Sequence, residues 1–312
     1  MQPDKEFVGL PKSFWANIRT ISQKVGYTLK PKRQKGVTGQ TGQIRIPSLD
    51  DIRTALTALD LTANHLVVNG NFTTLGSQVH RYYEYRANVL NTTVEPLLMD
   101  AARAEVLYDR LKLQLKPTTS PPMNKQKDEK NKVAYFTAII NMLIEANIGG
   151  LPCNYNPQEL TTVTRNREPF RTLARRIDGA FPRPVDPLAV WEIKEYYYTT
   201  TFGSRVADGV YETLLDGMEL EELDVALQEL ATLEDRPIHI QHLLMVDAYD
   251  TWWLKGRSYL CRIIDMLHMG YVDEVLFGKE VATRLPIIVQ EWVKEYDGRK
   301  AAQARIVRPV DD

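Results

Sequence analysis

The sequence predicts a mixed α/β protein, with a central mixed sheet flanked by helices and a helical module attached at its N-terminal side. Helical spacing of apolar residues fills the first part of the chain, and strand-like runs alternate with helix-like runs after about residue 133. With 312 residues, of which 44% are hydrophobic and 25% charged, the chain has a globular composition and the length of two ordinary domains or one large one.

The N-terminal segments carry apolar residues on one helical face. In the segment 12–27, Phe14, Ile18 and Ile21 recur at spacings of three and four residues, which predicts a helix. A second helix is expected to begin after Ser48, because Asp51 follows three positions later in a capping-box-like arrangement. Two further helices are expected in this module, over 78–90 and 94–115.

A change of composition divides the chain. The segment 116–132 has lost its apolar residues and gained Pro, Ser, Thr and Lys, which is typical of a linker. We therefore expect a helical N-terminal module at 1–120 and a second domain at 121–312. A helix over 133–148 opens the second domain and ends at a Gly-Gly pair.

Strand-like runs follow this helix. They cover 174–181 and 188–199, and a proline-rich turn joins them. The elements expected after this pair are two helices, a strand and two more helices, over 204–215, 220–233, 238–249, 257–269 and 286–296.

Several absences bear on the compartment. The chain has no run of about 18 apolar residues that could cross a bilayer, and its first residues lack the apolar core of a signal peptide. The two cysteines, Cys153 and Cys261, have no metal-ligand spacing and indicate reduced thiols. We therefore expect a cytoplasmic protein with no membrane partner.

Positive charge is uneven along the chain although the net charge is −1. A glycine-rich stretch carries four basic residues, Lys30, Lys32, Arg33 and Lys35. Such a stretch can act as a flexible arm on the backbone of a nucleic acid, with a salt-dependent and sequence-independent attraction. The alternative is a solvated surface loop.

The run 188–199 places charged residues in an otherwise buried strand. Alternation puts Ala189, Trp191 and Ile193 on one face, which suits packing against a helix. Glu192 and Lys194 share the other face, roughly 7 Å apart along the strand. Because isolated charges in a core are costly, these two side chains need a partner, a metal ion or an opening to solvent.

Asp178 is the nearest candidate partner in the sequence. It precedes Glu192 by fourteen positions, so a hairpin of the two strands brings the two carboxylates together beside the Lys194 ammonium group. Such an oxygen-rich site suits Mg²⁺, which proteins hold with one or two carboxylates while water and substrate phosphate complete the coordination. The alternative is that Glu192 and Lys194 form an exposed pair on a half-solvated sheet edge, with Asp178 in a turn.

Asp178, a spacer and then Glu192-Ile193-Lys194 on a strand resembles the motif of the PD-(D/E)XK nuclease family, the core of many restriction endonucleases. The order of elements over about 133–267 agrees with this resemblance: a helix, the Asp strand, the acid-X-Lys strand, a helix and a further strand. Ile177 stands where the motif has its proline. The resemblance implies a restriction-endonuclease-like core.

The resemblance also implies roles for individual residues. Asp178 and Glu192 would hold Mg²⁺ with the backbone carbonyl of Ile193, and Lys194 would orient or help deprotonate the attacking water. Glu145, on the preceding helix, matches an acidic residue that some members add; its alternative is a solvated position near a helix end.

The function implied by the resemblance is Mg²⁺-dependent hydrolysis of double-stranded DNA by a type II restriction enzyme of the prokaryotic cytoplasm. Cutting both strands suggests a homodimer, with a cognate DNA methyltransferase in the same system. Tyr197 and Arg205 are candidate DNA contacts together with the basic stretch, although tyrosine is also a common strand residue. Two alternatives remain open: a structure-specific repair or recombination nuclease, and a non-catalytic DNA-binding protein.

Overall fold

The structure is a computed structural model, and it describes residues 1–29, 42–124, 132–198, 203–230 and 239–306. The four basic residues predicted to form a DNA-binding arm, Lys30, Lys32, Arg33 and Lys35, lie outside the described residues.

The described residues before residue 90 form three helices and two short hairpins, and the helices and the second hairpin pack around a core of their own. The helices are α1 (Lys12–Val25), α2 (Leu49–Thr57) and α3 (Thr74–Val89), and the hairpin strands are β1 (Thr28–Leu29), β2 (Gln43–Ile44), β3 (Val67–Val68) and β4 (Asn71–Phe72). The predicted helix start at Ser48 is confirmed. Its hydroxyl accepts from the Asp51 N–H at 3.1 Å, and the Asp51 carboxylate accepts from the Ser48 N–H at 3.0 Å.

The chain expected as one helix over 94–115 is broken in two. A π-helical turn (Leu90–Val94) and α4 (Glu95–Leu97) end at Leu98, whose backbone is extended. α5 (Ala101–Leu115) then begins afresh, because the Asp100 side chain caps it by accepting from the Arg103 N–H at 2.8 Å. α5 packs against α6 (Tyr135–Asn147), so contacts with the second half of the chain begin before the segment expected as a linker.

A four-stranded mixed sheet forms the centre of the second half, in the order β10-β9-β8-β7. Its strands are β7 (Gly179–Phe181), β8 (Ala189–Glu195), β9 (Gln241–Asp247) and β10 (Glu274–Phe277). β7 pairs antiparallel with β8, whereas β8, β9 and β10 are mutually parallel. The prediction missed β10 and a separate hairpin, β5 (Thr162–Arg165) with β6 (Glu168–Thr172), and it started the Asp178 strand too early.

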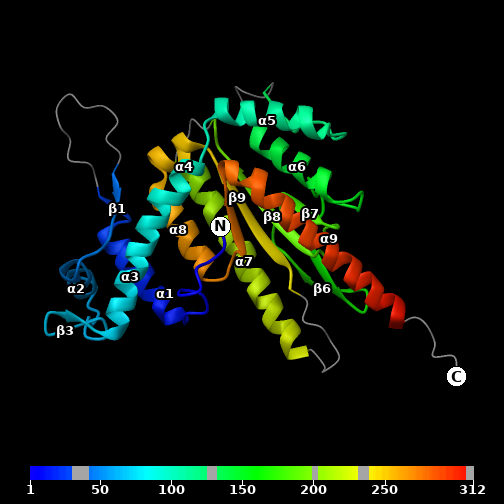
Figure 1. The fold of residues 1–312 in the computed structure, drawn as a ribbon. Coiled ribbons are helices and arrows are strands. Elements are labelled where there is room, and N and C mark those ends of the chain that lie inside the picture. Colours follow the sequence, from blue (N-terminus) through cyan, green and yellow to red (C-terminus); the bar gives the residue numbers. More distant parts are fainter. Residues whose placement is uncertain (30–41, 125–131, 199–202, 231–238, 307–312) are drawn as a thin grey trace.

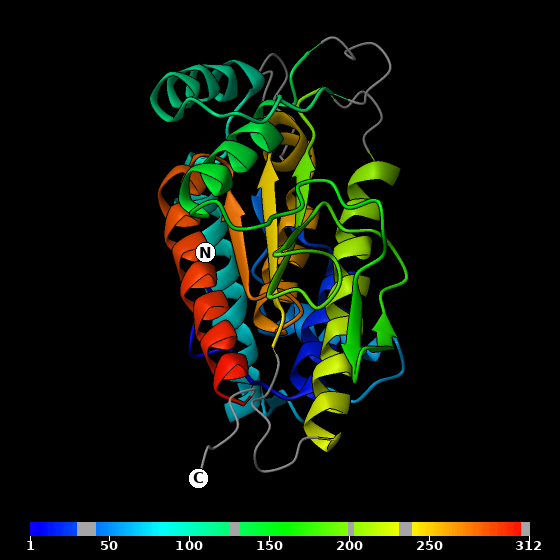
Figure 2. The same ribbon diagram turned by 90° about the vertical axis from the view of Figure 1, so that its right-hand side faces the viewer.

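Helices cover both faces of the sheet (Figure 2). α6 and α9 (Val281–Ile306) lie on one face, and α7 (Ser204–Leu230) and α8 (Arg257–His268) lie on the other. Short turns, Asp250–Lys255 and Gly278–Glu280, precede α8 and α9. The face predicted for Ala189 and Trp191 is confirmed, since both are buried with α6 and α9 and the Trp191 ring stacks on Trp292 with 5.6 Å between centroids.

α7 is one continuous helix where two were expected. The expected break falls at Asp216-Gly217, which usually indicates a turn. Here Gly217 stays helical because the helix passes the backbone of Tyr271 so closely that a Cβ at Gly217 would lie 2.2 Å from the Tyr271 carbonyl oxygen. The glycine is therefore used for a close approach and not for a turn. None of the helices in the described residues is both long and apolar enough to cross a membrane.

A buried ion pair joins the N-terminal module to the second half. Arg86 on α3 donates to both carboxylate oxygens of Asp265 on α8 at 2.9 Å, and the Tyr82 hydroxyl donates to the same carboxylate at 2.7 Å. All three side chains are buried. This pair holds α3 against α8.

Candidate active site

The hairpin of β7 and β8 places Asp178 beside Glu192. Gly179 is opposite Trp191 in the ladder, so Asp178 lies at the start of β7 next to Glu192. The Asp178 N–H donates to Glu192 Oε1 at 3.2 Å, and the Ile193 N–H donates to Asp178 Oδ2 at 2.8 Å. The two strands therefore hold the two carboxylates in a fixed relation.

Gly179 makes this arrangement possible. A Cβ at this position would lie 2.0 Å from the Trp191 indole, which fills the space above the strand. Only glycine leaves room for the ring, so the packing of Trp191 requires a glycine directly after Asp178.

Lys194 completes the group predicted from the sequence. Its Nζ donates to Glu192 Oε2 at 2.8 Å and to Glu212 Oε2 at 3.1 Å. Glu192 is 0% exposed and Lys194 is 6% exposed, and β8 is an interior strand. The alternative of an exposed pair on a half-solvated sheet edge is therefore wrong.

Three further residues that the sequence reasoning did not select surround this group. Arg175 lies 3.0 Å from Glu192 Oε1 and 2.5 Å from Asp216 Oδ2. Glu212 and Asp216 are four residues apart on α7, which puts both on the helix face toward β8. That spacing was the available signal, but it was hidden because α7 was divided at Asp216-Gly217.

We call these six residues the charged cluster: Asp178, Glu192, Glu212, Asp216, Arg175 and Lys194. Its four carboxylates face two cationic groups, so two negative charges are in excess when all four acids are ionised. Asp216 is 0% exposed, and its Oδ1 has no hydrogen-bond partner among the described residues. An unmatched buried carboxylate oxygen is costly and favours the approach of a cation.

The acid pKa values reflect this imbalance. Burial raises the pKa of Asp178 to about 6 and that of Asp216 to about 7, and in both cases the Glu192 carboxylate adds to the rise. Burial also acts to raise the pKa of Glu192, but Lys194 and Arg175 outweigh it and lower that pKa. Glu192 is thus held ionised more firmly than Asp178 and Asp216.

The pKa of Lys194 moves in the opposite sense from that of a buried, unpaired lysine. Burial acts to lower it, but the Glu192 and Asp178 carboxylates outweigh burial and raise it above its ordinary value. Lys194 is therefore a protonated donor in this arrangement, suited to orienting a water or a phosphate oxygen and not to removing a proton.

A cavity of about 730 Å³ opens beside Asp178 and Ile193. Arg205 also lines it, is exposed and has no side-chain hydrogen bond or ion pair with other described residues, whereas the Tyr197 hydroxyl donates to Asp247 at 2.5 Å. Asn141 on α6 lines the same cavity, and its buried Oδ1 has no hydrogen-bond partner in the part of the chain that is described. The cavity therefore offers an unsatisfied amide and an arginine on the side where Asp178 is accessible.

Glu145 makes contacts of its own, away from the charged cluster. Its carboxylate accepts from the Thr118 N–H at 2.9 Å and from the Thr119 hydroxyl at 2.6 Å. Its recorded partners are thus two threonines of the preceding segment, which it ties to α6. Thr119 lines the 730 Å³ cavity, so Glu145 supports the cavity wall.

A hard divalent cation at the charged cluster would be reached through Asp178, the member of the cluster that lines the cavity. Asp178 Oδ1 has no hydrogen-bond partner among the described residues, while Asp178 and Ile193 both line the cavity. Within the described ranges no group of three or more His, Cys, Asp or Glu side chains is arranged to bind a metal. Bound Mg²⁺ would therefore depend on Asp178, Glu192 and the Ile193 carbonyl, with water and substrate oxygens completing its coordination.

These features define an α/β protein with a charged, partly open cluster at the start of an antiparallel strand pair. The chain belongs to the family described as a domain of unknown function (DUF7687), which matches residues 99–292, more than half of its length. A second domain of unknown function (DUF7690) matches residues 1–93. No curated protein and no solved structure matches the chain. The two matches leave only residues 94–98 between them, and the division at residue 120 stays a prediction.

Proposed function

We propose that this chain is a Mg²⁺-dependent endonuclease of the PD-(D/E)XK type that hydrolyses phosphodiester bonds of double-stranded DNA, and that it acts as a type II restriction enzyme. The observation that carries the proposal is that Asp178, directly before β7, meets Glu192 of β8, which is paired with Lys194, while Asp178 lines a cavity. The sheet supports a restriction-endonuclease-like core, because β7 and β8 are antiparallel and α7 then leads to the parallel strand β9.

Each residue has a chemical task in this proposal. Asp178, Glu192 and the Ile193 carbonyl would hold the cation, which when bound supplies Lewis acidity at the scissile phosphate. The Lys194 ammonium, held by Glu192 and Glu212, orients the attacking water and stabilises the charge that grows on the phosphate oxygens. The water oxygen bonds to phosphorus and loses a proton to solvent, one P–O bond breaks, and the leaving oxygen takes a proton from solvent.

The rest of the proposal concerns DNA and assembly. Arg205, which lines the cavity, would contact a phosphate, and Tyr197 would offer its ring because its hydroxyl is bonded to Asp247. The N-terminal module would grip or read the duplex. A two-fold homodimer would supply one active site for each strand, and a cognate DNA methyltransferase would protect the host sequence.

The test is cleavage of plasmid DNA with Mg²⁺. Discrete fragments are expected from a restriction enzyme, whereas junction-selective cutting or a smear would assign a repair or recombination nuclease. Lys194→Ala should lower the cleavage rate by about 10²–10³-fold, while DNA binding in Ca²⁺, followed by gel mobility shift, stays intact. Lys294→Ala is the matched control, because Lys294 is an exposed lysine on α9 across the sheet. Failure of the wild-type protein to cut any duplex in Mg²⁺ would contradict the proposal.

A further inference from the structure

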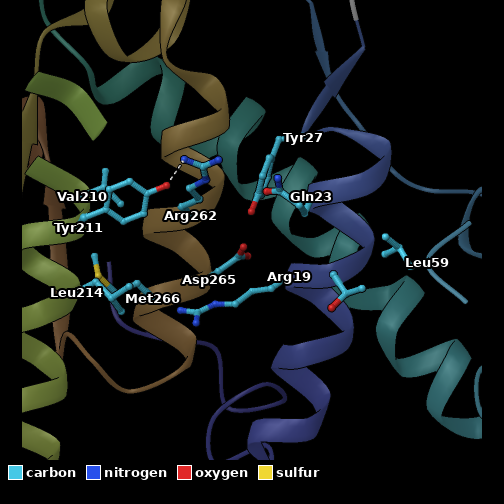
Figure 3. A pocket seen from close by; sticks show the side chains of 11 residues that line it. Arg19, Gln23, Tyr27, Leu59, Val210, Tyr211, Leu214, Arg262, Asp265 and Met266 are labelled. Atoms are coloured by element: carbon cyan, nitrogen blue, oxygen red, sulfur yellow. Dashed lines mark hydrogen bonds between the residues drawn. The ribbon is translucent and has the colours of Figure 1, made fainter. Parts of the chain in front are cut away.

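A second cavity, of about 450 Å³, lies between the N-terminal module and helices α7 and α8 (Figure 3). α1 and the segment after it contribute Arg19, Gln23 and Tyr27, and α7 contributes Tyr211. α8 contributes Arg262. The two family-matched segments therefore build this cavity together, and none of its residues belongs to the charged cluster. Its volume is in the range of ligand pockets, which often form between domains.

The lining is cationic and aromatic. The Arg262 guanidinium lies 5.0 Å from the centre of the Tyr27 ring and donates to the Tyr211 hydroxyl at 3.1 Å. Arg19 is exposed and has no partner among the described residues. Figure 3 shows the guanidinium of Arg19 reaching into the cavity on the side away from Arg262.

The acidic residue of the lining does not cancel this charge. Asp265 lines the cavity, but both of its oxygens accept from Arg86, and Oδ1 also accepts from Tyr82. Its charge is balanced by Arg86, so Arg19 and Arg262 leave the cavity positive. An anionic ligand is therefore favoured over a cationic one.

The remaining wall consists of apolar side chains and one aromatic ring. Val210 and Met266 are buried, Leu214 is half-buried, and the Tyr211 ring is 52% exposed beside them. A planar ring can pack between the Tyr211 face and these side chains, and stacking of a base on an aromatic side chain contributes about 1–3 kcal/mol. The ligand is thus expected to combine a flat ring with an anionic group.

We propose that this cavity binds a nucleoside monophosphate unit, with its base against Tyr211 and the apolar wall and its phosphate paired with Arg19. The unit is either a free nucleotide or one nucleotide of a DNA strand, since both present the same base and phosphate. The proposal does not rest on the nuclease function, because the cavity and the charged cluster lie on different sides of α7.

Isothermal titration of the full-length protein tests this proposal. The probes are the four deoxynucleoside monophosphates, a short single-stranded oligonucleotide and inorganic phosphate. We expect saturable binding of a mononucleotide or of the oligonucleotide. The affinity for inorganic phosphate should be at least about tenfold lower, because phosphate lacks the ring that stacks on Tyr211. Arg19→Ala and Tyr211→Ala should each weaken nucleotide affinity about tenfold.

Lys24→Ala is the matched control, because it removes an exposed cation from the last turn of α1 outside the cavity. Binding of free mononucleotides would identify a small ligand, and binding of the oligonucleotide alone would identify a DNA strand; both support the proposal. Lys194→Ala should bind the nucleotide like the wild type, which keeps this test separate from cleavage. Absence of saturable binding, or affinity unchanged in both Arg19→Ala and Tyr211→Ala, would overturn it.

Discussion

Two clusters of buried charge among the described residues are built differently. The Arg86–Asp265 pair matches one acid with one base and adds the Tyr82 hydroxyl as a further donor. The charged cluster sets four carboxylates against two cations, leaves Asp216 Oδ1 without a hydrogen-bond partner in the described part of the chain, and reaches a cavity through Asp178. Burial of charge alone therefore does not identify a functional site. An unmatched charge next to open volume is the more specific sign.

The two regions should respond to mutation with opposite signs. Removing one member of a matched buried ion pair leaves the other charge buried without a partner, which lowers stability. Removing an excess like charge relieves repulsion instead. The following predictions use this contrast, beginning with the largest expected effect on stability.

Asp265→Ala should lower the free energy of unfolding by about 3–5 kcal/mol, because Arg86 is left buried and uncompensated. Urea denaturation followed by circular dichroism measures this loss. Asp109→Ala, an exposed aspartate on α5, serves as the control and should change stability by less than about 0.5 kcal/mol. A loss as small as that of the control would show that the pair does not hold α3 against α8.

Asp216→Asn should have the opposite sign and raise the free energy of unfolding by up to about 4 kcal/mol at pH 8. The pKa of Asp216 is raised to about 7, so the folded protein binds this proton more tightly than the unfolded chain does. Wild-type stability from this group is therefore lost as pH rises from about 4 through 7, whereas the amide does not titrate. Denaturation at pH 4 to 8 should show the gain growing with pH. If Asp216→Asn were less stable than the wild type at pH 8, the charged cluster would not have the excess of negative charge that we assign to it.

Mg²⁺ should stabilise the wild-type protein by about 1.4 kcal/mol at a tenfold excess over its dissociation constant. Asp178→Asn should abolish this shift in a thermal melt, and Asp109→Asn should keep it. Because the pKa of Asp178 is raised to about 6, its protonation should weaken the Mg²⁺ effect as pH falls below that value. An equal shift in Asp178→Asn would place the cation elsewhere.

Glu145→Gln should have the smallest effect, changing the cleavage rate by less than about threefold. Its carboxylate bonds to Thr118 and Thr119 and makes no recorded contact with the charged cluster. Glu192→Gln, measured in the same plasmid assay, provides the contrast with a large loss. A loss in Glu145→Gln comparable to that of Glu192→Gln would restore the catalytic role implied by the family resemblance.

The part of the site that could be predicted from the sequence is local. Strand alternation fixes which side chains of β8 share a face, and the short turn before it brings Asp178 to Glu192. The residues on α7 were not selected, because the expected break at Asp216-Gly217 hid the four-residue spacing of Glu212 and Asp216. Their place on one helix face depends on α7 continuing through Gly217, which lies against the backbone of Tyr271.

The same limit applies to the fold. The predicted helix start at Ser48 was correct because capping needs only four consecutive residues. β10 was missed because its short apolar run, Glu274–Phe277, becomes a strand only through its parallel partner β9. The cavity that Arg19 and Tyr211 line likewise forms from segments far apart in the chain, so periodicity within one segment carries no trace of it.

The fit of Gly179 under the Trp191 indole has a consequence for sequence change over time. Every other side chain at position 179 collides with the Trp191 ring. A smaller residue at position 191 would remove this collision, so glycine would no longer be required at position 179. Diverging descendants of this gene should therefore retain the two residues together or lose both. A deep mutational scan would reveal this joint intolerance even in cells where DNA cutting is not under selection.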